Sequence, residues 1–118
     1  MKTVLIVDDS PTIQRTISFM LRRMGHAAVM ANNGVEALDQ LQNNLVDVII
    51  TDIIMPEMDG LTLMETVRQQ AALRHIPVIL LTESGEWQQD KRSQKADGVL
   101  TKPVSSHQLM GKIASLFP

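Results

Sequence analysis

Carboxylates follow two of the most apolar segments of this sequence. Asp8 and Asp9 come directly after residues 4–7, and Asp52 follows residues 48–51. Carboxylates that are held close together repel one another, so such a group ionises readily only beside a cation. A set of oxygen ligands without Cys or His suits a hard ion such as Mg²⁺. If the fold brings them together, these acids are candidate ligands of a divalent metal.

A hydroxyl and an ammonium group follow two further apolar segments. Thr82 comes after residues 78–81, and Lys102 comes two residues after Leu100. Together with a metal, an ammonium and a hydroxyl donor stabilise the oxygens of a phosphoryl group. A carboxylate in such a site can attack phosphorus and form an acyl phosphate. We predict that Asp52 is this nucleophile, because it follows a buried run and precedes a loop shaped by Pro56 and Gly60.

The elements that would position these groups alternate along the chain. Short runs rich in β-branched residues are separated by stretches with helical spacing, which is typical of βα units around a parallel sheet. The predicted strands cover residues 3–7, 27–31, 46–51, 76–81 and 99–101. The third and fourth are continuously apolar, so we expect them at the centre of the sheet.

The stretches between the strands predict helices. The first follows Ser10 and Pro11, which suit a cap and a first helical position, and stops at Gly25. Three others cover residues 35–45, 61–71 and 109–117. A fifth, at residues 85–95, has Trp87 as its only large apolar side chain, so packing would stabilise it little. The predicted fold class is therefore α/β, a doubly wound sheet in one domain spanning residues 1–118.

This architecture predicts where the reactive groups meet. In open α/β sheets, ligands bind beyond the carboxyl ends of the strands. Each candidate residue follows a predicted strand, so we expect all of them at one edge of the sheet although they are distant in sequence.

Composition excludes several other classes of protein. The 118 residues include 11 basic and 13 acidic side chains, for a formal charge of −2, which disfavours direct nucleic-acid binding. Cysteine is absent, which excludes thiolate metal sites and is compatible with a cytoplasmic location. The apolar run at residues 4–7 is too short for a signal peptide or a membrane span.

Four motifs in this order resemble the receiver domains of response regulators in two-component signalling, of the stand-alone chemotaxis type. The motifs are Val7-Asp8-Asp9-Ser10, the stretch from Asp52 to Gly60, Leu81-Thr82 and Thr101-Lys102-Pro103. The resemblance covers essentially the whole chain. It implies a flavodoxin-like fold with five parallel strands in the order 2-1-3-4-5, flanked by five helices.

The resemblance also implies roles for individual residues. Asp52 would accept a phosphoryl group from a histidine kinase. Asp8 and Asp9 would hold Mg²⁺ together with Asp52 and the backbone carbonyl of Ile54. Thr82 and Lys102 would contact the phosphoryl group. The peptide bond between Lys102 and Pro103 would be cis. Such a protein catalyses only its own phosphorylation and dephosphorylation, so it is not an enzyme acting on a free substrate.

The sequence departs from the family pattern at two positions. Receivers that relay their state through an aromatic side chain carry it three residues before the lysine, where this chain has Val99. A small residue commonly follows the threonine, where this chain has Glu83. We expect that the carboxylate of Glu83 narrows access to the site or repels the phosphoryl group.

Three functions remain open at this point. The chain is a switch that binds an unidentified partner when phosphorylated, as a monomer or a weak dimer, or it is a relay that passes the phosphoryl group to a histidine phosphotransfer protein. The third function is a receiver fold that binds partners without phosphorylation. A phosphatase is disfavoured because the second acid expected after Asp52 is missing, and a flavodoxin because Asp8 and Asp9 would repel the flavin phosphate.

Overall fold

The computed structural model describes residues 1–83 and 91–117. The strands are β1 (Thr3–Val7), β2 (Ala27–Ala31), β3 (Val48–Asp52), β4 (Val78–Thr82) and β5 (Gly98–Thr101). The helices are α1 (Pro11–Arg23), α2 (Gly34–Asn43), α3 (Gly60–Gln69) and α4 (Ser106–Leu116), with a 3-10 helix, η2 (Lys91–Lys95), between β4 and β5.

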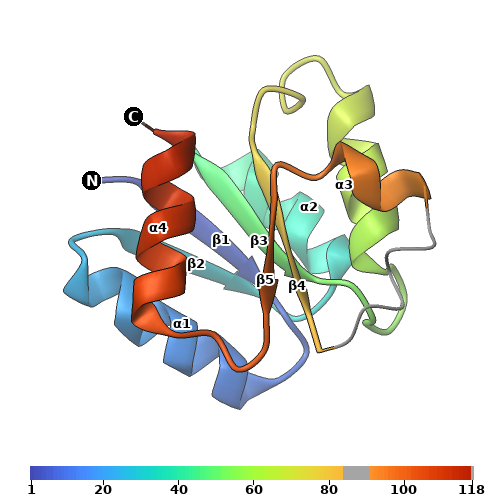
Figure 1. Ribbon diagram of the computed structural model, residues 1–118. Coiled ribbons are helices and arrows are strands. Elements are labelled where there is room, and N and C mark those ends of the chain that lie inside the picture. The colour runs from blue at the N-terminus through green and yellow to red at the C-terminus, as the bar shows by residue number, and fades with distance from the viewer. Residues whose placement is uncertain (84–90, 118) are drawn as a thin grey trace.

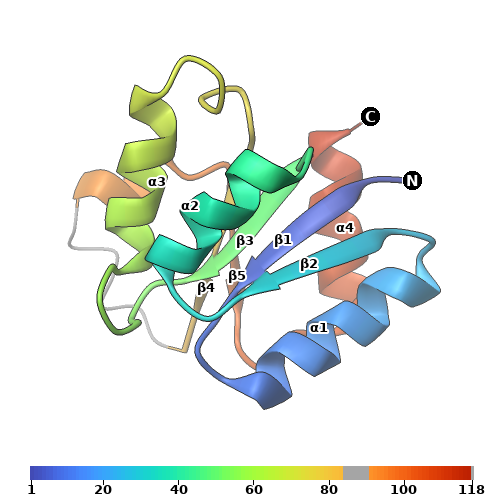
Figure 2. The same ribbon diagram turned by 180° about the vertical axis from the view of Figure 1, so that it is seen from behind.

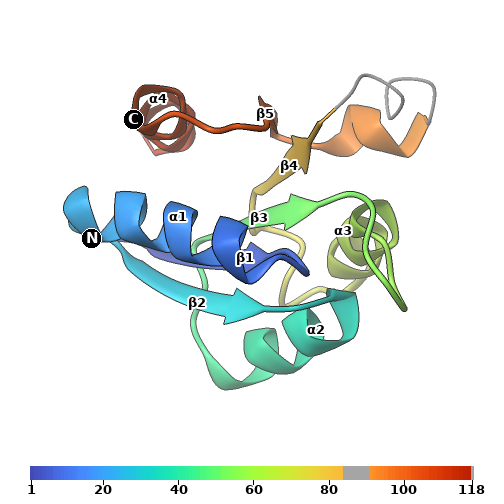
Figure 3. The ribbon, with the colours of Figure 1, turned by 90° about the horizontal axis from the view of Figure 1, so that it is seen from below.

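All strands are parallel and lie in the order β2-β1-β3-β4-β5, which confirms the predicted topology. Helices α1 and α4 cover one face of the sheet, and α2 and α3 cover the other (Figures 1 and 3). Each face has its own apolar core. Alternate residues of β1 enter the two cores, with Leu5 on the α2 and α3 side and Ile6 on the α1 and α4 side.

Strands β3 and β4 both begin two residues later and end one residue later than the sequence predicts. Ile76 is buried, but its N–H binds Leu73 O in a turn, so burial alone did not place it in the sheet. At the start of β4, the Val78 N–H binds the Asp97 carboxylate at 2.8 Å, and Asp97 is also paired with Arg68. Because both strands end one residue later than predicted, the functional candidates Asp52 and Thr82 are the last residues of β3 and β4.

The second helix is shorter than predicted. Asn33 caps it by accepting the Glu36 N–H at 2.9 Å, so α2 starts at Gly34 and buries Ala37 and Leu41. Leu45 lies beyond its end and is 95% exposed. The apolar spacing extended the predicted helix to this leucine, but Leu45 lies outside the helix and does not reach the core.

The predicted helix at residues 85–95 is only partly described. Residues 84–90, including Trp87, lie outside the described residues, and the remainder forms the 3-10 helix η2. The structure thus describes four α-helices rather than the five expected. Within η2, Arg92 contacts Thr62 and Glu65 of α3, each at 3.2 Å. These contacts hold η2 against α3.

The two ends of the described chain lie together. Figures 1 and 2 show both termini on the side of the molecule away from the carboxyl ends of the strands. The Lys2 ammonium sits 4.3 Å from the centre of the Phe117 ring, which links β1 to the end of α4. No helix in the described residues is long and apolar enough to cross a membrane.

Two glycines allow a paired test of how tightly the end of β3 is packed. A Cβ on Gly60 would lie 2.0 Å from the backbone oxygen of Asp52, whereas one on Gly111 in α4 would meet nothing within 4 Å. We expect Gly60→Ala to lower the free energy of unfolding by about 3 kcal/mol or more. The new Cβ would clash with the Asp52 backbone oxygen, which, unlike a side chain, cannot move aside by changing its rotamer. Gly111→Ala should raise it by about 0.5–1 kcal/mol through helix propensity. Urea unfolding of both variants checks this, and equal values for the two would contradict the packing argument.

Candidate functional site

The turn between β1 and α1 holds the first two carboxylates. Asp8 is fully buried, its N–H binds Ala31 O of β2 at 3.1 Å, and its Oδ1 accepts the Ser10 N–H at 2.8 Å. Ser10 in turn caps α1 by accepting the Ile13 N–H at 3.3 Å, as the sequence predicts. Asp9 follows in the turn and is exposed. The helix cap and the ladder with β2 therefore fix Asp8 from both sides.

Asp52 and Lys102 approach the same place from the other strands. Asp52 ends β3, and its Oδ1 accepts the Ile53 N–H at 2.8 Å. The Lys102 ammonium lies 3.0 Å from Asp8 Oδ2 and 3.3 Å from Asp52 Oδ2. The side chains are nearly buried, with exposed fractions of 11% for Lys102 and 13% for Asp52. One ammonium is thus shared by two carboxylates.

Asp9 completes the cluster, since carboxylate oxygens of Asp8, Asp9 and Asp52 all lie within 4.8 Å of one another. The three acids predicted as metal ligands therefore come together with the predicted lysine at one edge of the sheet. Counting this cluster alone, three carboxylates face one ammonium, so the pocket keeps a negative charge when all are ionised.

Burial and the neighbouring charges together shift the pKa values of the two central groups, Asp52 and Lys102. Burial, and then the charge of Asp8, raise the pKa of Asp52 above its ordinary value of 3.8, although Lys102 opposes the change. Burial lowers the pKa of Lys102, but its close contact with the Asp8 carboxylate and the charge of Asp52 outweigh burial, and the net change is upward. Lys102 stays protonated, and Asp52 is ionised less readily than an ordinary aspartate.

The pocket fits a divalent cation. Asp8 Oδ2 is buried, and although it lies near the Lys102 ammonium, no donor in the described part of the chain is aligned to make a hydrogen bond with it. A buried oxygen of this kind calls for a partner. The donors are all carboxylate oxygens, which suit Mg²⁺ or Ca²⁺ rather than a softer metal.

The loop from β3 to α3 borders this pocket. Met58 N–H binds Pro56 O at 2.8 Å, and Glu57 between them has a φ of 69°, which describes a tight three-residue turn with a strained centre. Asp59 caps α3 by accepting the Thr62 N–H at 2.7 Å. These contacts fix the course of the loop that carries Ile54.

The remaining predicted residues lie at the same edge. Thr82 ends β4 next to Thr101 of β5, and its backbone oxygen accepts the Lys102 N–H at 2.8 Å. The bond between Lys102 and Pro103 is cis. The Ile54 side chain, two residues after Asp52, is 79% exposed, and Glu83 is also exposed. The roles of Thr82 and of the Ile54 carbonyl stay predictions.

Two residues near the pocket have roles that the sequence analysis did not assign. Gln14 of α1 donates to Asp8 O at 2.6 Å, and Gly60 brings α3 against the end of β3. Only the position of Gly60 in the loop motif hinted at a close approach. A polar amide at Gln14, one turn after the two acids, resembles any surface glutamine.

The family model of the response regulator receiver domain matches residues 4–114. The chain belongs to this family. A receiver domain of similar length, the chemotaxis protein CheY homolog of Campylobacter jejuni, is 40% identical over 114 residues, which are 93% of this chain and 88% of the relative. The sensor histidine kinase RcsC of Salmonella typhi is 33% identical over 113 residues, which are 94% of this chain but only 12% of the kinase.

Solved receiver domains show the same fold. The response regulator TrrA of Thermotoga maritima, in its complex with Mg²⁺-BeF, superimposes with a TM-score of 0.91 at 32% identity, covering 99% of this chain and 100% of that one. The chain is therefore a CheY-like receiver domain of two-component signalling. Its acidic pocket lies where the sequence motifs of the family predict it.

The raised pKa of Asp52 makes a prediction about stability. Because the ionised carboxylate is disfavoured in the folded state, the folded protein loses stability as pH rises from about 3.8 through the higher folded pKa. Asp52→Asn should therefore stabilise the metal-free protein at neutral pH, by on the order of 1 kcal/mol, and progressively less as pH falls. Thermal unfolding in a chelating buffer at several pH values checks this. A stabilisation that grows toward acidic pH would contradict it.

Proposed function

We propose that this receiver domain accepts a phosphoryl group on Asp52 from the phosphohistidine of a histidine kinase, in a reaction that requires Mg²⁺. The observation that carries the proposal is the lysine ammonium shared between two carboxylates, 3.0 Å from Asp8 and 3.3 Å from Asp52. Asp9 lies in the same cluster. Membership of the family, and the Mg²⁺-BeF complex of the related TrrA, support the proposal.

In the proposed reaction, a carboxylate oxygen of Asp52 attacks phosphorus while the bond to the histidine nitrogen breaks. The electron pair returns to the imidazole of the donor, which is thereby released. Lys102 already faces the Asp52 carboxylate, so its ammonium can pair with a phosphoryl oxygen without a large movement. Thr82, at the end of the neighbouring strand, would donate its hydroxyl to another phosphoryl oxygen.

Asp8, Asp9, Asp52 and the Ile54 carbonyl would hold the Mg²⁺. The bound ion supplies positive charge that offsets both the carboxylates and the incoming phosphoryl oxygens. The protein changes its own covalent state in this scheme and turns over no free substrate. We place it in the cytoplasm, where histidine kinases expose their phosphorylated domains.

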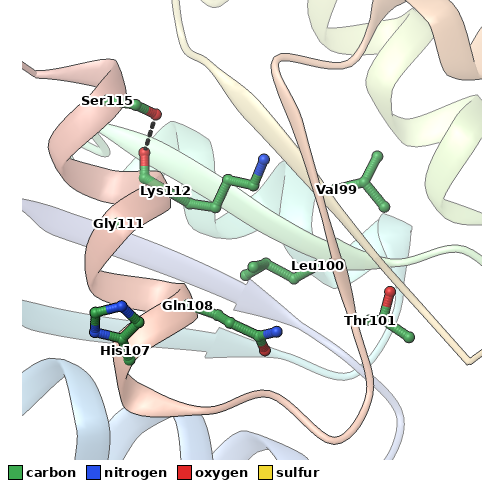
Figure 4. Close-up of a pocket in the computed structure, with 8 residues that line it drawn as sticks. All are labelled: Val99, Leu100, Thr101, His107, Gln108, Gly111, Lys112 and Ser115. Carbon is green, nitrogen blue, oxygen red and sulfur yellow. Dashed lines mark hydrogen bonds between the residues drawn. The ribbon is translucent and has the colours of Figure 1, made fainter.

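We propose that the output is protein binding at the face formed by β5 and α4. A groove of about 430 Å³ lies between them (Figure 4), lined by Val99, Leu100, Thr101, His107, Gln108, Gly111, Lys112 and Ser115. Leu100 points toward α4, whereas Val99 and Thr101 point to the other side of the strand. Lys102 directly follows β5, so a movement of its ammonium toward a phosphoryl group acts on the end of this strand.

A relay is the second candidate. The match to RcsC shows a receiver-like segment inside a histidine kinase, an arrangement in which a phosphoryl group could be passed on. A histidine phosphotransfer protein that removes phosphate from Asp52 much faster than water does would favour the relay. Phosphorylation-dependent binding of a protein without a phosphoacceptor histidine would favour the switch.

The phosphoacceptor role has a direct test. Incubation with acetyl phosphate and Mg²⁺ should add the mass of one phosphoryl group to the wild-type protein, and none to Asp52→Asn. Intact-mass spectrometry measures this, and omission of Mg²⁺ is the control for the metal requirement. An equal mass gain in Asp52→Asn would place the phosphoryl group on another residue and contradict the proposal.

The departure at Glu83 predicts a rate. This exposed carboxylate follows Thr82 and repels an anionic phosphodonor, so Glu83→Ala should raise the rate of phosphorylation by acetyl phosphate by about two- to threefold. Because exposed charges are screened, the increase should shrink at high ionic strength. Glu83→Gln, which keeps the size of the side chain, separates charge from access. An unchanged rate in both variants would show that Glu83 does not act on the donor.

A further inference from the structure

One side-chain amide ties together the two strand ends beside the acidic pocket. Gln14 lies one turn into α1, and its Nε2 donates to Asp8 O at 2.6 Å, to Ala31 O at 3.2 Å and to Asn32 Oδ1 at 2.9 Å. An amide nitrogen has two hydrogens, which these three oxygens share. Gln14 therefore connects the end of β1, the end of β2 and the residue after it.

The bond to Asp8 O matters because that oxygen belongs to the peptide between Asp8 and Asp9. Among the described residues, no hydrogen bond or ion pair holds the Asp9 carboxylate, which is exposed. Its direction thus depends on the orientation of this peptide. The Asp8 carboxylate has its own partners in Ser10 and Lys102 and depends on the peptide less.

Gln14 is itself held from the side of α2. Asn32 accepts from Gln14 through Oδ1 and donates through Nδ2 to Glu36 Oε1 at 3.0 Å. The Asn32 N–H donates to the same Glu36 oxygen at 3.1 Å. A flip of the Asn32 side-chain amide would break both its bond from Gln14 and its bond to Glu36, so these contacts fix the amide of Gln14 in one orientation.

We propose that Gln14 is a positioning residue for the metal site, which acts by fixing the peptide between Asp8 and Asp9 so that the Asp9 carboxylate faces Asp52. This inference rests on the proposed function, because it assumes that Asp9 binds Mg²⁺. A neutral amide suits the role. It binds the backbone oxygens without adding a positive charge that would compete with the metal.

The test is a calorimetric titration of the unphosphorylated full chain with Mg²⁺ alone. Gln14→Met keeps the length of the side chain and removes the donor, and we expect it to weaken Mg²⁺ binding about tenfold, in the range seen when a residue that orients a metal ligand is lost. Gln40→Met is the matched control. Gln40 Nε2 also donates from a helix to a β2 oxygen, Met30 O, at 3.1 Å. The Gln40→Met substitution should leave the affinity for Mg²⁺ unchanged.

Two results would overturn the proposal. One is an unchanged affinity in Gln14→Met, and the other is an equal loss in Gln40→Met, which would indicate general loosening of β2. Should thermal unfolding in a chelating buffer show that Gln14→Met does not fold, Asn32→Ala carries the test, with an expected loss of at least about twofold.

Asp9→Asn separates this inference from the proposed function. If Asp9→Asn binds Mg²⁺ as tightly as the wild type, the metal site itself is wrongly placed. If Asp9→Asn loses affinity and Gln14→Met does not, the metal site stands and the positioning role of Gln14 is wrong.

Discussion

The structure depends on an unequal number of opposite charges at the carboxyl edge of the sheet. Three carboxylates meet there, and the single ammonium of Lys102 contacts two of them. One lysine cannot neutralise this group, so the pocket favours a second cation. Burial, and then the charge of Asp8, make Asp52 harder to ionise in this pocket than in water.

Uncharged residues of the neighbouring strands and helices hold the carboxylates of this pocket in place. The register of β1 with β3 places Val7 beside Thr51, so Asp8 and Asp52 follow at the same level. Gly60 lets α3 begin against the backbone of Asp52, and a Met58 side chain fills the space beside Gly34 at the start of α2. The starts of α2 and α3 thus hold the loop that follows Asp52.

The alternation of strands and helices, and the residues that follow each strand, could be predicted from the sequence. The order of the strands and helices, the Ser10 cap and the meeting of Asp8, Asp52 and Lys102 follow from the apolar runs and the polar or turn residues that separate them. The predicted limits of β3, β4 and α2 were wrong. At β4 and α2 the reason is that Ile76 and Leu45 are apolar without belonging to a strand or helix. Gln14 could not be predicted, since two of its three acceptors are backbone oxygens, and the sequence does not show where those point.

The position of the chain ends has a consequence for how such a domain works within longer proteins. Both ends lie on the far side from the acidic pocket, joined by the contact between Lys2 and Phe117. A domain fused at either end would begin on the side of the molecule away from the acidic pocket. Without a long linker, such a neighbour would not reach the acidic pocket. A change at the pocket would then reach it only through shifts in the elements that lie between the two sides of the molecule.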